Sequence, residues 1–380
     1  MRPLRELTLL SALDDLRTAL RFPRCALNLA RDCASGVGAT PFPRRLGLFV
    51  TNRCDFACPM CAVQDARDDG LARGGDMPFE IVERVLEECS RHQPLVDWIG
   101  GEPLLYGPLE DAVRLASRRR VPSVVTTNGL KLAERAEALA RAGLPFLQVS
   151  LDGWDEETQA ARGRVRGSFG RLCEGVRAVK RARGGGAFPI VRILTAITRV
   201  NHAHLDRIQQ VVNELGVRYW AITNYFYLNR AAHERHREFA LIHGLSGAVA
   251  AHAIAEDTYL TPEQVRELKV SLARVRGMSR RAGPRISYAW KIDVGEYYSG
   301  RQASAACACQ LPYTRLDVHT DGHLAVCVSG KRVGQAGEDT IAAVWRGAET
   351  ARYRTMYERT RPMPMCFRCC GLSQTIRFRE

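Results

Sequence analysis

Short apolar runs alternate along the chain with amphipathic segments. The run Arg45–Thr51 predicts a first strand, and Phe79–Arg91 predicts an amphipathic helix behind it. Further strand signals follow at Val96–Gly100, Val121–Thr127, Phe146–Leu151, Val191–Ile197 and Tyr219–Tyr225. Strands that alternate with helices are typical of an α/β fold with a parallel sheet. The pattern therefore predicts an α/β barrel with six strands.

The first 42 residues form a separate pattern. Leucine and alanine recur near helical spacing through Leu4–Leu20 and again through Cys25–Ala30. We expect a helical cap on the bottom of the barrel. The alternative is a basic amphipathic segment that lies on a membrane or a partner. Acidic residues such as Glu6 and Asp14 interrupt any clean basic face, which favours the cap.

Composition limits the class of protein. The chain has 380 residues, of which 46% are hydrophobic, enough for a sizeable core and two to three domains. No apolar run reaches the roughly 18 residues that cross a bilayer, and the start lacks the apolar core of a signal peptide. We therefore expect a cytoplasmic globular protein without a membrane partner.

The chain is strongly basic, with a net charge of +14 and a pI near 9.4. Such a charge indicates either anionic partners or well-solvated arginine faces, and segments such as Arg177–Arg183 favour the second interpretation. The sequence lacks the interleaved basic and aromatic motif of an RNA-binding module, so we do not expect nucleic acid as a partner. A small phosphorylated, nucleotide-linked or carboxylated substrate explains the charge equally well.

Three cysteines directly after the first predicted strand carry the strongest chemical signal. Cys54, Cys58 and Cys61 have the spacing CxxxCxxC. Three thiolates can hold three corners of a 4Fe-4S cluster and leave the fourth iron open to a small molecule. A structural zinc site needs four closed ligands, usually as two CxxC pairs, and this run offers three.

A second motif, Gly100-Gly101-Glu102-Pro103, follows the second predicted strand. Together with CxxxCxxC it resembles the radical S-adenosylmethionine (SAM) superfamily. The resemblance implies a partial (β/α)6 TIM-like radical SAM barrel that is open on one side. It also implies that SAM binds the open iron, and that one electron cleaves it to methionine and a 5'-deoxyadenosyl radical that abstracts a substrate hydrogen.

Further residues are expected to bind SAM. The glycines allow close backbone approach to a ligand, and with Glu102 they suit a methionine ammonium group. Thr127 and Asn128 stand at the carboxyl end of the third strand, where barrel enzymes place their chemistry. By the resemblance, Ser150 and Asp152 face the ribose or methionine part of SAM. Arg162 would pair with its carboxylate, with Arg164 as a competitor.

The tail suggests a second metal site. Six of the thirteen cysteines lie after residue 306, and four of them fit a pattern of C-x12-G-x4-C, a gap and CxxC: Cys309, Cys327, Cys366 and Cys369. Four thiolates suit either a second 4Fe-4S cluster or one zinc ion. The arrangement resembles the small α+β twitch form of the SPASM extension. It places a hairpin over the cluster from strands around Leu316–Val318 and Leu324–Val328, with its turn at Asp321-Gly322.

These motifs predict four regions. We expect a cap over residues 1–42, the radical SAM barrel over 43–228, a linker or substrate-covering region over 229–304 and the auxiliary cluster domain over 305–380. The histidines of the linker, among them His236, are spread too widely to suggest ligands.

The reaction is predicted from the second cluster. A cluster with four protein ligands cannot bind SAM, so its expected role is electron transfer, which favours net oxidation. We expect an oxidoreductase that acts on a sugar, aminocyclitol or nucleoside-type metabolite, similar to twitch-bearing alcohol oxidases of antibiotic pathways. A low-potential donor such as flavodoxin or ferredoxin would supply the electron.

Three alternatives stay open. The chain could crosslink a peptide or form thioethers in it. It could be a redox-neutral epimerase in which Cys307 or Cys370 returns a hydrogen, although these cysteines could equally be spare ligands. It could also be a non-enzymatic metal-binding protein on a decayed barrel.

Overall fold

A computed structural model gives the fold of most of the chain. It describes residues 16–28, 40–59, 61, 75–163, 165–245, 254–255, 259–281, 283–288, 293–298, 309–327 and 331–369. Arg164, Cys307 and Cys370 lie outside the described residues, as does the side chain of Arg162.

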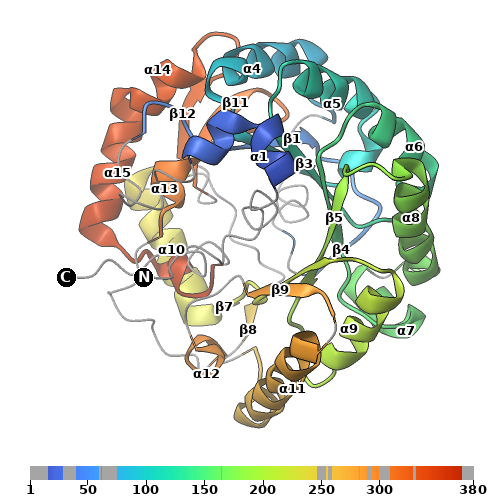
Figure 1. Cartoon of the computed structure of the whole chain (residues 1–380). Coiled ribbons are helices and arrows are strands. Elements are labelled where there is room, and N and C mark those ends of the chain that lie inside the picture. Colours follow the sequence, from blue (N-terminus) through green and yellow to red (C-terminus); the bar gives the residue numbers. More distant parts are fainter. Residues whose placement is uncertain are drawn as a thin grey trace.

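Six parallel strands form the centre of the molecule, in chain order and side by side: β1 (Arg45–Thr51), β2 (Leu95–Gly100), β3 (Ser123–Thr127), β4 (Phe146–Ser150), β5 (Ile190–Ala196) and β6 (Tyr219–Thr223). Each predicted strand is confirmed, with its ends shifted by at most two residues. The helices that connect these strands lie on the outside of the curved sheet (Figure 1): α4 (Phe79–His92), α5 (Leu109–Arg118), α6 (Leu132–Arg141), α7 (Glu156–Gly163), α8 (Ser168–Arg183) and α9 (Leu205–Glu214).

The side chains of each strand point alternately to the outer and to the inner face of this barrel. On β1, Leu46, Leu48 and Val50 are fully buried in the apolar core that also contains residues of α4. Arg45 and Gly47 lie on the opposite, interior face, where Arg45 pairs with Asp97 of β2. A side chain at Gly47 would lie 2.2 Å from Asp317 Oδ1, so glycine leaves room for charged groups inside the barrel.

The sheet is wider than the six predicted strands. Beyond β6 it continues with β9 (Arg285–Tyr288), which is parallel to β6. Beyond β1 it continues with β10 (Arg315–Val318), also parallel, and then with the antiparallel strands β11 (His323–Val326) and β12 (Lys331–Gln335). The described sheet has ten strands and ends at β12 and β9. The tail hairpin is therefore an extension of the barrel sheet itself.

The region predicted as a linker contributes regular structure. It contains the strands β7 (Leu228–Asn229), β8 (Ile254–Ala255) and β9, and the helices α10 (Arg230–His243), α11 (Pro262–Arg281) and α12 (Val294–Tyr298). The tail adds three helices, which are α13 (Leu311–Thr314), α14 (Ile341–Arg346) and α15 (Ala348–Thr360), and the 3-10 helix η3 (Pro364–Arg368). The boundaries predicted between the four regions stay predictions.

The N-terminal segment contacts the barrel. After α1 (Leu16–Arg21), Phe22 and Cys25 pack with Val124 and Phe146, which lie near the amino ends of β3 and β4. Arg21 donates to the carbonyl of Gly143 at 2.8 Å. In Figure 1, α1 is drawn in front of the sheet, beside the labels of β1 and β3. The described part of the segment thus contacts the amino-end side of the barrel, and the cap over residues 1–42 stays a prediction.

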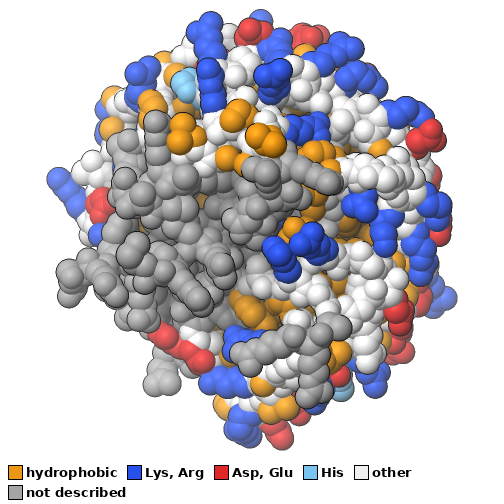
Figure 2. Space-filling model, in the orientation of Figure 1, with side chains coloured by type: hydrophobic (Ala, Val, Ile, Leu, Met, Phe, Trp, Pro, Cys, Tyr) orange, Lys and Arg blue, Asp and Glu red, His pale blue; other side chains and the backbone are white. Residues whose placement is uncertain are grey.

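The surface charge is dispersed. Figure 2 shows Lys and Arg side chains spread around the rim of one face, with acidic side chains between them. On α8, Arg177 and Arg181 are exposed, as expected of a solvated helix face. None of the helices in the described residues is long and apolar enough to cross a bilayer.

Candidate active site

The loop after β1 carries the first three cysteines. Cys54, Cys58 and Cys61 are half-buried, and the amide of Cys61 donates to the carbonyl of Cys58 at 3.1 Å. Burial raises the pKa of Cys54 to about 11, although the amide of Phe56 donates to its sulfur at 3.4 Å. The thiolate is the form that binds a metal, so loading a cluster here would remove a proton from Cys54.

The two glycines after β2 bring this loop close to the sheet. The Gly101 amide donates to Thr51 O and the Glu102 amide to Arg53 O, each at 2.7 Å. A Cβ at Gly101 would lie 2.0 Å from Arg53 O, and one at Gly100, where φ is +130°, would lie 2.3 Å from Thr51 O. These amides are therefore engaged within the chain, and a contact from this run to SAM would come from other atoms. The close approach that requires glycine here is to the cysteine loop.

Glu102 connects the ends of two strands to this loop. Its Oε1 accepts from Thr127 Oγ1 at 2.7 Å and from the Leu104 amide at 3.0 Å, and its Oε2 accepts from the Asn128 amide at 2.8 Å. Complete burial raises the pKa of Glu102 to about 7, and the three donors oppose this rise. Asn128 in turn donates through Nδ2 to Asp55 Oδ1 at 2.7 Å, beside Cys54. The residues predicted on β2, β3 and the loop thus meet at one place.

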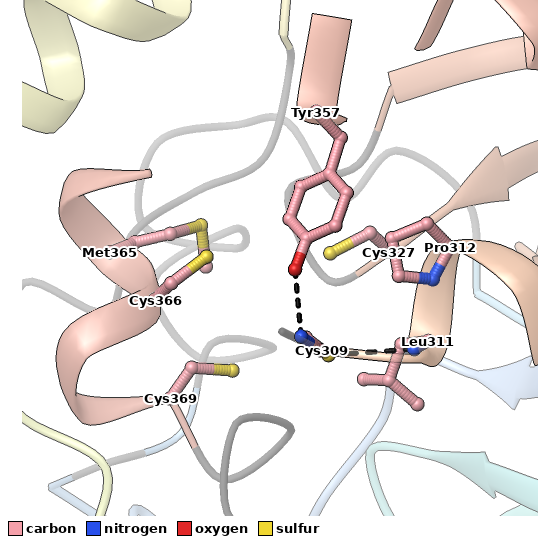
Figure 3. A pocket seen from close by; sticks show the side chains of 8 residues that line it. All are labelled: Cys309, Leu311, Pro312, Cys327, Tyr357, Met365, Cys366 and Cys369. Atoms are coloured by element: carbon pink, nitrogen blue, oxygen red, sulfur yellow. Dashed lines mark hydrogen bonds between the residues drawn. The ribbon is translucent and has the colours of Figure 1, made fainter. Parts of the chain in front are cut away.

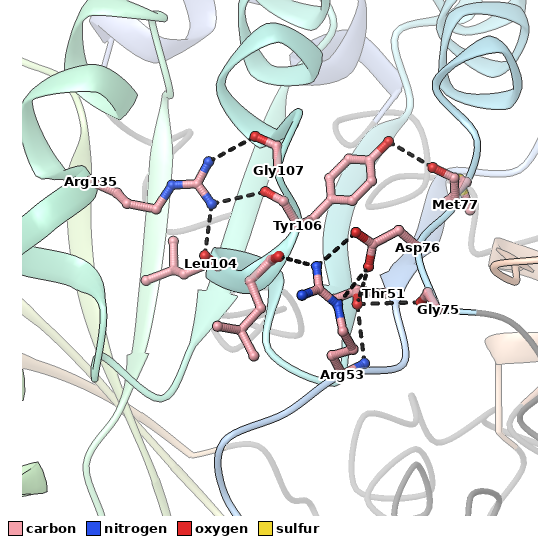
Figure 4. Close-up of polar contacts among 10 residues, drawn as sticks. Thr51, Arg53, Gly75, Asp76, Met77, Leu104, Tyr106, Gly107 and Arg135 are labelled. Atoms are coloured by element: carbon pink, nitrogen blue, oxygen red, sulfur yellow. Dashed lines mark hydrogen bonds and ion pairs between the residues drawn. The ribbon is translucent and has the colours of Figure 1, made fainter.

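A second set of polar contacts, which the sequence did not reveal, holds the start of the cysteine loop (Figure 4). Arg53 pairs with Asp76 at 2.7 Å and also donates to the carbonyl of Leu105. Asp76 accepts from Thr51 Oγ1 at 2.7 Å as well. Beside it, Tyr106 donates to the carbonyl of Met77 at 2.9 Å. The position of Arg53 directly before Cys54 is the sequence signal that could have pointed to these contacts.

The end of β4 supplies Ser150 and Asp152, both buried. Asp152 Oδ1 accepts from the Ala196 amide at the end of β5 at 2.7 Å, and its own amide donates to Gln159 at 2.9 Å. Asp152 is thus fixed at the carboxyl ends of β4 and β5, on the same end of the barrel as the cysteine loop. The structure gives no contact that assigns Ser150 or Asp152 to SAM, so their roles stay predictions.

The end of α7 reaches the cysteine loop. The Ala57 amide donates to Gly163 O at 3.3 Å, and a Cβ at Gly163 would lie 2.0 Å from the ring of Phe56. Arg162 precedes this glycine, so its backbone lies next to the loop. Its proposed pairing with the SAM carboxylate concerns a side chain outside the described residues.

The four cysteines predicted in the tail converge (Figure 3). Cys309, Cys327, Cys366 and Cys369 are 6 to 7% exposed and line one cavity together with Leu311, Pro312, Tyr357 and Met365. The Tyr357 hydroxyl accepts from the Cys309 amide at 2.8 Å. Burial, followed by the charge of Cys327, raises the pKa of Cys366 to about 12. Cys327 itself has a left-handed backbone with a φ of +66°, a conformation that bulky residues adopt rarely and mostly at functional sites.

The spacing of these thiols bears on the choice between zinc and a cluster. One tetrahedral zinc ion draws its four sulfurs to within about 3.8 Å of one another, since each Zn–S bond is about 2.3 Å. The sulfurs that ligate a 4Fe-4S cube bind four different irons and lie farther apart. Four buried thiols on one cavity suit either of these groups, so the geometry leaves both open.

Two of the tail cysteines, Cys309 and Cys327, lie at the opposite end of neighbouring strands from the first loop. The parallel register pairs Arg45, the first residue of β1, with Arg315, the first residue of β10. Cys54 follows the carboxyl end of β1, whereas Cys309 precedes the amino end of β10 and Cys327 follows β11 at that same end. The other two follow a different course: η3, which contains Cys366, packs against α10, and its Met365 packs with Leu228 beyond the carboxyl end of β6.

Comparisons with known proteins agree with this geometry. Residues 48–212 match the family model of the radical SAM superfamily, and residues 307–370 match that of SPASM, an iron-sulfur cluster-binding domain. A probable GTP 3',8-cyclase of Methanocella arvoryzae is 31% identical over 163 residues, which cover 43% of this chain and 50% of that protein. The match thus spans half the length of that relative. A GTP 3',8-cyclase of Mycobacterium sp. (strain KMS) is 27% identical over 323 residues, 80% of this chain and 83% of that protein.

Solved structures share the fold. Streptococcus suis SuiB bound to S-adenosylmethionine superposes with a TM-score of 0.62 at 17% identity, over 93% of this chain and 76% of SuiB. The cofactors are accordingly S-adenosylmethionine, a SAM-binding 4Fe-4S cluster and an auxiliary cluster. The two family matches identify the chain as a radical SAM protein with a C-terminal SPASM iron-sulfur cluster-binding domain.

Proposed function

We propose that this enzyme oxidises a sugar, aminocyclitol or nucleoside-type metabolite with the help of its auxiliary cluster. The convergence of four buried cysteines on one cavity carries the proposal. Four protein thiolates complete the ligation of a 4Fe-4S cube, which leaves no iron for SAM or substrate. Electron transfer is the role that such a closed site supports.

Within this substrate class, a nucleoside-type substrate has further support. The relative from Mycobacterium sp. (strain KMS), matched over most of its length, is named for a reaction of GTP. The net charge of +14 is compatible with an anionic substrate, although solvated arginine faces account for it as well. The likeness to SuiB, which has also been solved with a precursor peptide, is one of fold at 16% identity and does not favour a peptide substrate.

Different groups of residues would hold the two clusters and position the cysteine loop. Cys54, Cys58 and Cys61 would hold the cluster that supplies the electron for SAM cleavage, and the tail cysteines would hold the one that accepts an electron from the substrate. Glu102, with Thr127 and Asn128, keeps the cysteine loop against the ends of β2 and β3. For an alcohol substrate, one SAM and one alcohol would give methionine, 5'-deoxyadenosine, a carbonyl compound and a proton. The electron used for cleavage is recovered in oxidation, so no net external reductant is consumed.

The test uses anaerobically reconstituted holoenzyme with a panel of ribonucleosides, their 5'-triphosphates and nucleotide sugars. We expect one member of the panel to stimulate 5'-deoxyadenosine formation and to appear as a product lighter by two hydrogens. A Cys58→Ala variant should make no 5'-deoxyadenosine. A Cys366→Ala variant should still make it but lose the oxidised product. A product of unchanged mass, formed together with 5'-deoxyadenosine, would contradict the proposal and favour the epimerase alternative.

A further inference from the structure

A buried arginine, Arg192, faces the interior of the barrel. It lies on β5 and is 8% exposed. Its charge interacts with Arg45 and Asp97, which belong to β1 and β2. Those strands are separated from β5 by β3 and β4 in the sheet, so the interaction crosses the barrel interior. Arg192 therefore lies on the inner wall of the barrel.

Within the described residues, two of the nitrogen atoms of this guanidinium lack a hydrogen-bond partner. Nη2 donates to Gln148 Oε1 on β4, and Gln148 Nε2 donates onward to Thr126 Oγ1 at 3.3 Å. Nε and Nη1 are buried and, across the described part of the chain, have no acceptor. Buried polar groups almost always have partners, and an unpaired buried charge is costlier still. The pair of donors therefore indicates a missing acceptor.

The carboxylates of the barrel interior do not supply that acceptor. Asp97 is bound by Arg45 at 3.0 Å and by Arg315 at 3.2 Å, and Arg315 also pairs with Asp317 at 2.7 Å. Counting Arg192, this group thus contains three guanidiniums and two carboxylates. Burial and the charge of Arg45 lower the pKa of Arg192 to about 9, so it stays protonated at neutral pH. Among these described residues, the guanidiniums outnumber the carboxylates by one.

Arg192 lies deeper in the barrel than the strand ends where SAM is expected. On the neighbouring strand, Arg192 is in register with Gln148, whereas Ser150, at the carboxyl end, is in register with Leu194. Two residues correspond to about 6.6 Å, so Arg192 lies about that much deeper than the end of the barrel where SAM is expected. It is the third residue of β5 and faces the inside of the barrel.

We propose that Arg192 binds an oxyanion of the substrate, a phosphate or a carboxylate, and thereby selects for anionic substrates inside the barrel. The inference deepens the proposed function, because it names the class of substrate that this site accepts. Gln148 holds the guanidinium in place through Nη2 and leaves Nε and Nη1 for the anion. Two charge-assisted donors in a site shielded from water recognise an oxyanion strongly.

The experiment measures binding to the SAM-loaded holoenzyme by anaerobic calorimetry. The probes are inorganic phosphate, acetate, and GTP against guanosine. We compare the wild type with Arg192→Met and with Arg181→Met, a control that removes an exposed arginine from α8. Iron per chain and the SAM dissociation constant are measured for each variant. We expect Arg192→Met to bind phosphate or acetate at least tenfold more weakly and to lose any preference for GTP over guanosine. Arg181→Met should match the wild type.

Several results would overturn the proposal. Equal anion binding by Arg192→Met and the wild type, or no anion binding by the wild type, would mean that water satisfies the two donors. A loss of SAM affinity in Arg192→Met, with anion binding intact, would assign the oxyanion to SAM. The ratio of phosphate to acetate affinity distinguishes the two substrate chemistries.

A second measurement does not depend on the folding of a variant. A wild-type crystal soaked in selenate should show an anomalous selenium peak beside Arg192, with a selenate oxygen within hydrogen-bond distance of Nε or Nη1, and the absence of that peak would overturn the proposal. Neither measurement requires oxidation. Anion binding at Arg192 without any oxidised product would therefore refute the proposed function alone, and oxidation without anion binding would refute this inference alone.

Discussion

Replacing Gly101 with alanine should release the cysteine loop from the sheet. The new methyl would lie 2.0 Å from Arg53 O and 2.6 Å from the carbonyl carbon, and both are backbone atoms that cannot rotate away. Ordinary contact begins at 3.4 Å, so the two segments must part by about 1.4 Å. That movement breaks the bonds from the Gly101 and Glu102 amides to the loop.

The expected loss in the free energy of unfolding follows from these contacts. Forcing a methyl into a filled space costs about 1–3 kcal/mol. Each of the two lost hydrogen bonds contributes about 1 kcal/mol. We therefore expect Gly101→Ala to lower the free energy of unfolding by about 3–5 kcal/mol. Because the loop carries Cys54, Cys58 and Cys61, the variant should also lose the first cluster and retain about four irons from the auxiliary one.

The assay combines urea unfolding with iron and sulfide analysis under anaerobic conditions. Gly170→Ala is the matched control, since a Cβ there meets no atom within 4 Å and the residue lies inside α8. It should stabilise the chain by about 0.5–1 kcal/mol, because alanine is the better helix former. If Gly101→Ala keeps about eight irons and loses less than about 1 kcal/mol, the inferred role of the glycine run is wrong.

Three further changes test other parts of the site. Burial raises the pKa of Glu102 from 4.5 to about 7, so its contribution to stability is present below pH 4.5 and is lost as the pH rises through 7. The shift corresponds to about 3.4 kcal/mol, and the difference in unfolding free energy between wild type and Glu102→Gln should change by about this amount between pH 4.5 and 8. A pH-independent difference would contradict this. Asp97→Asn leaves Arg45 and Arg315 without their shared carboxylate and should cost about 3–5 kcal/mol in urea unfolding, whereas a loss under about 1 kcal/mol would refute the buried network. Cys366→Ala should hold about four irons and still bind SAM, and an unchanged iron content would exclude Cys366 as a ligand.

The central fold followed from local sequence signals. Each of the six barrel strands is an apolar run of five to seven residues, and the Asp321-Gly322 turn, with a φ of +84° at Gly322, fixes the tail hairpin. Local patterns could not show that β10 pairs with β1, because the partners Arg45 and Arg315 are far apart in the chain. The strand β9 was missed for the same reason, since its place is set by its pairing with β6.

The sequence also predicted part of the candidate site. The spacing of the cysteines identified both sets, and the structure brings the tail set together at one cavity. The contacts that hold the first loop were not visible, because Arg53 meets Asp76 and Glu102 meets Thr127 only after folding. The unpaired donors of Arg192 depend on which strands face one another across the barrel, which periodicity does not reveal.

The central claim is that this chain holds two different clusters. Iron and labile sulfide per chain, with electron paramagnetic resonance of the reduced holoenzyme with and without SAM, test it most directly. The account predicts about eight irons per chain, one signal that shifts when SAM is added and a second that does not. About four irons, with zinc bound by the tail cysteines, would contradict it.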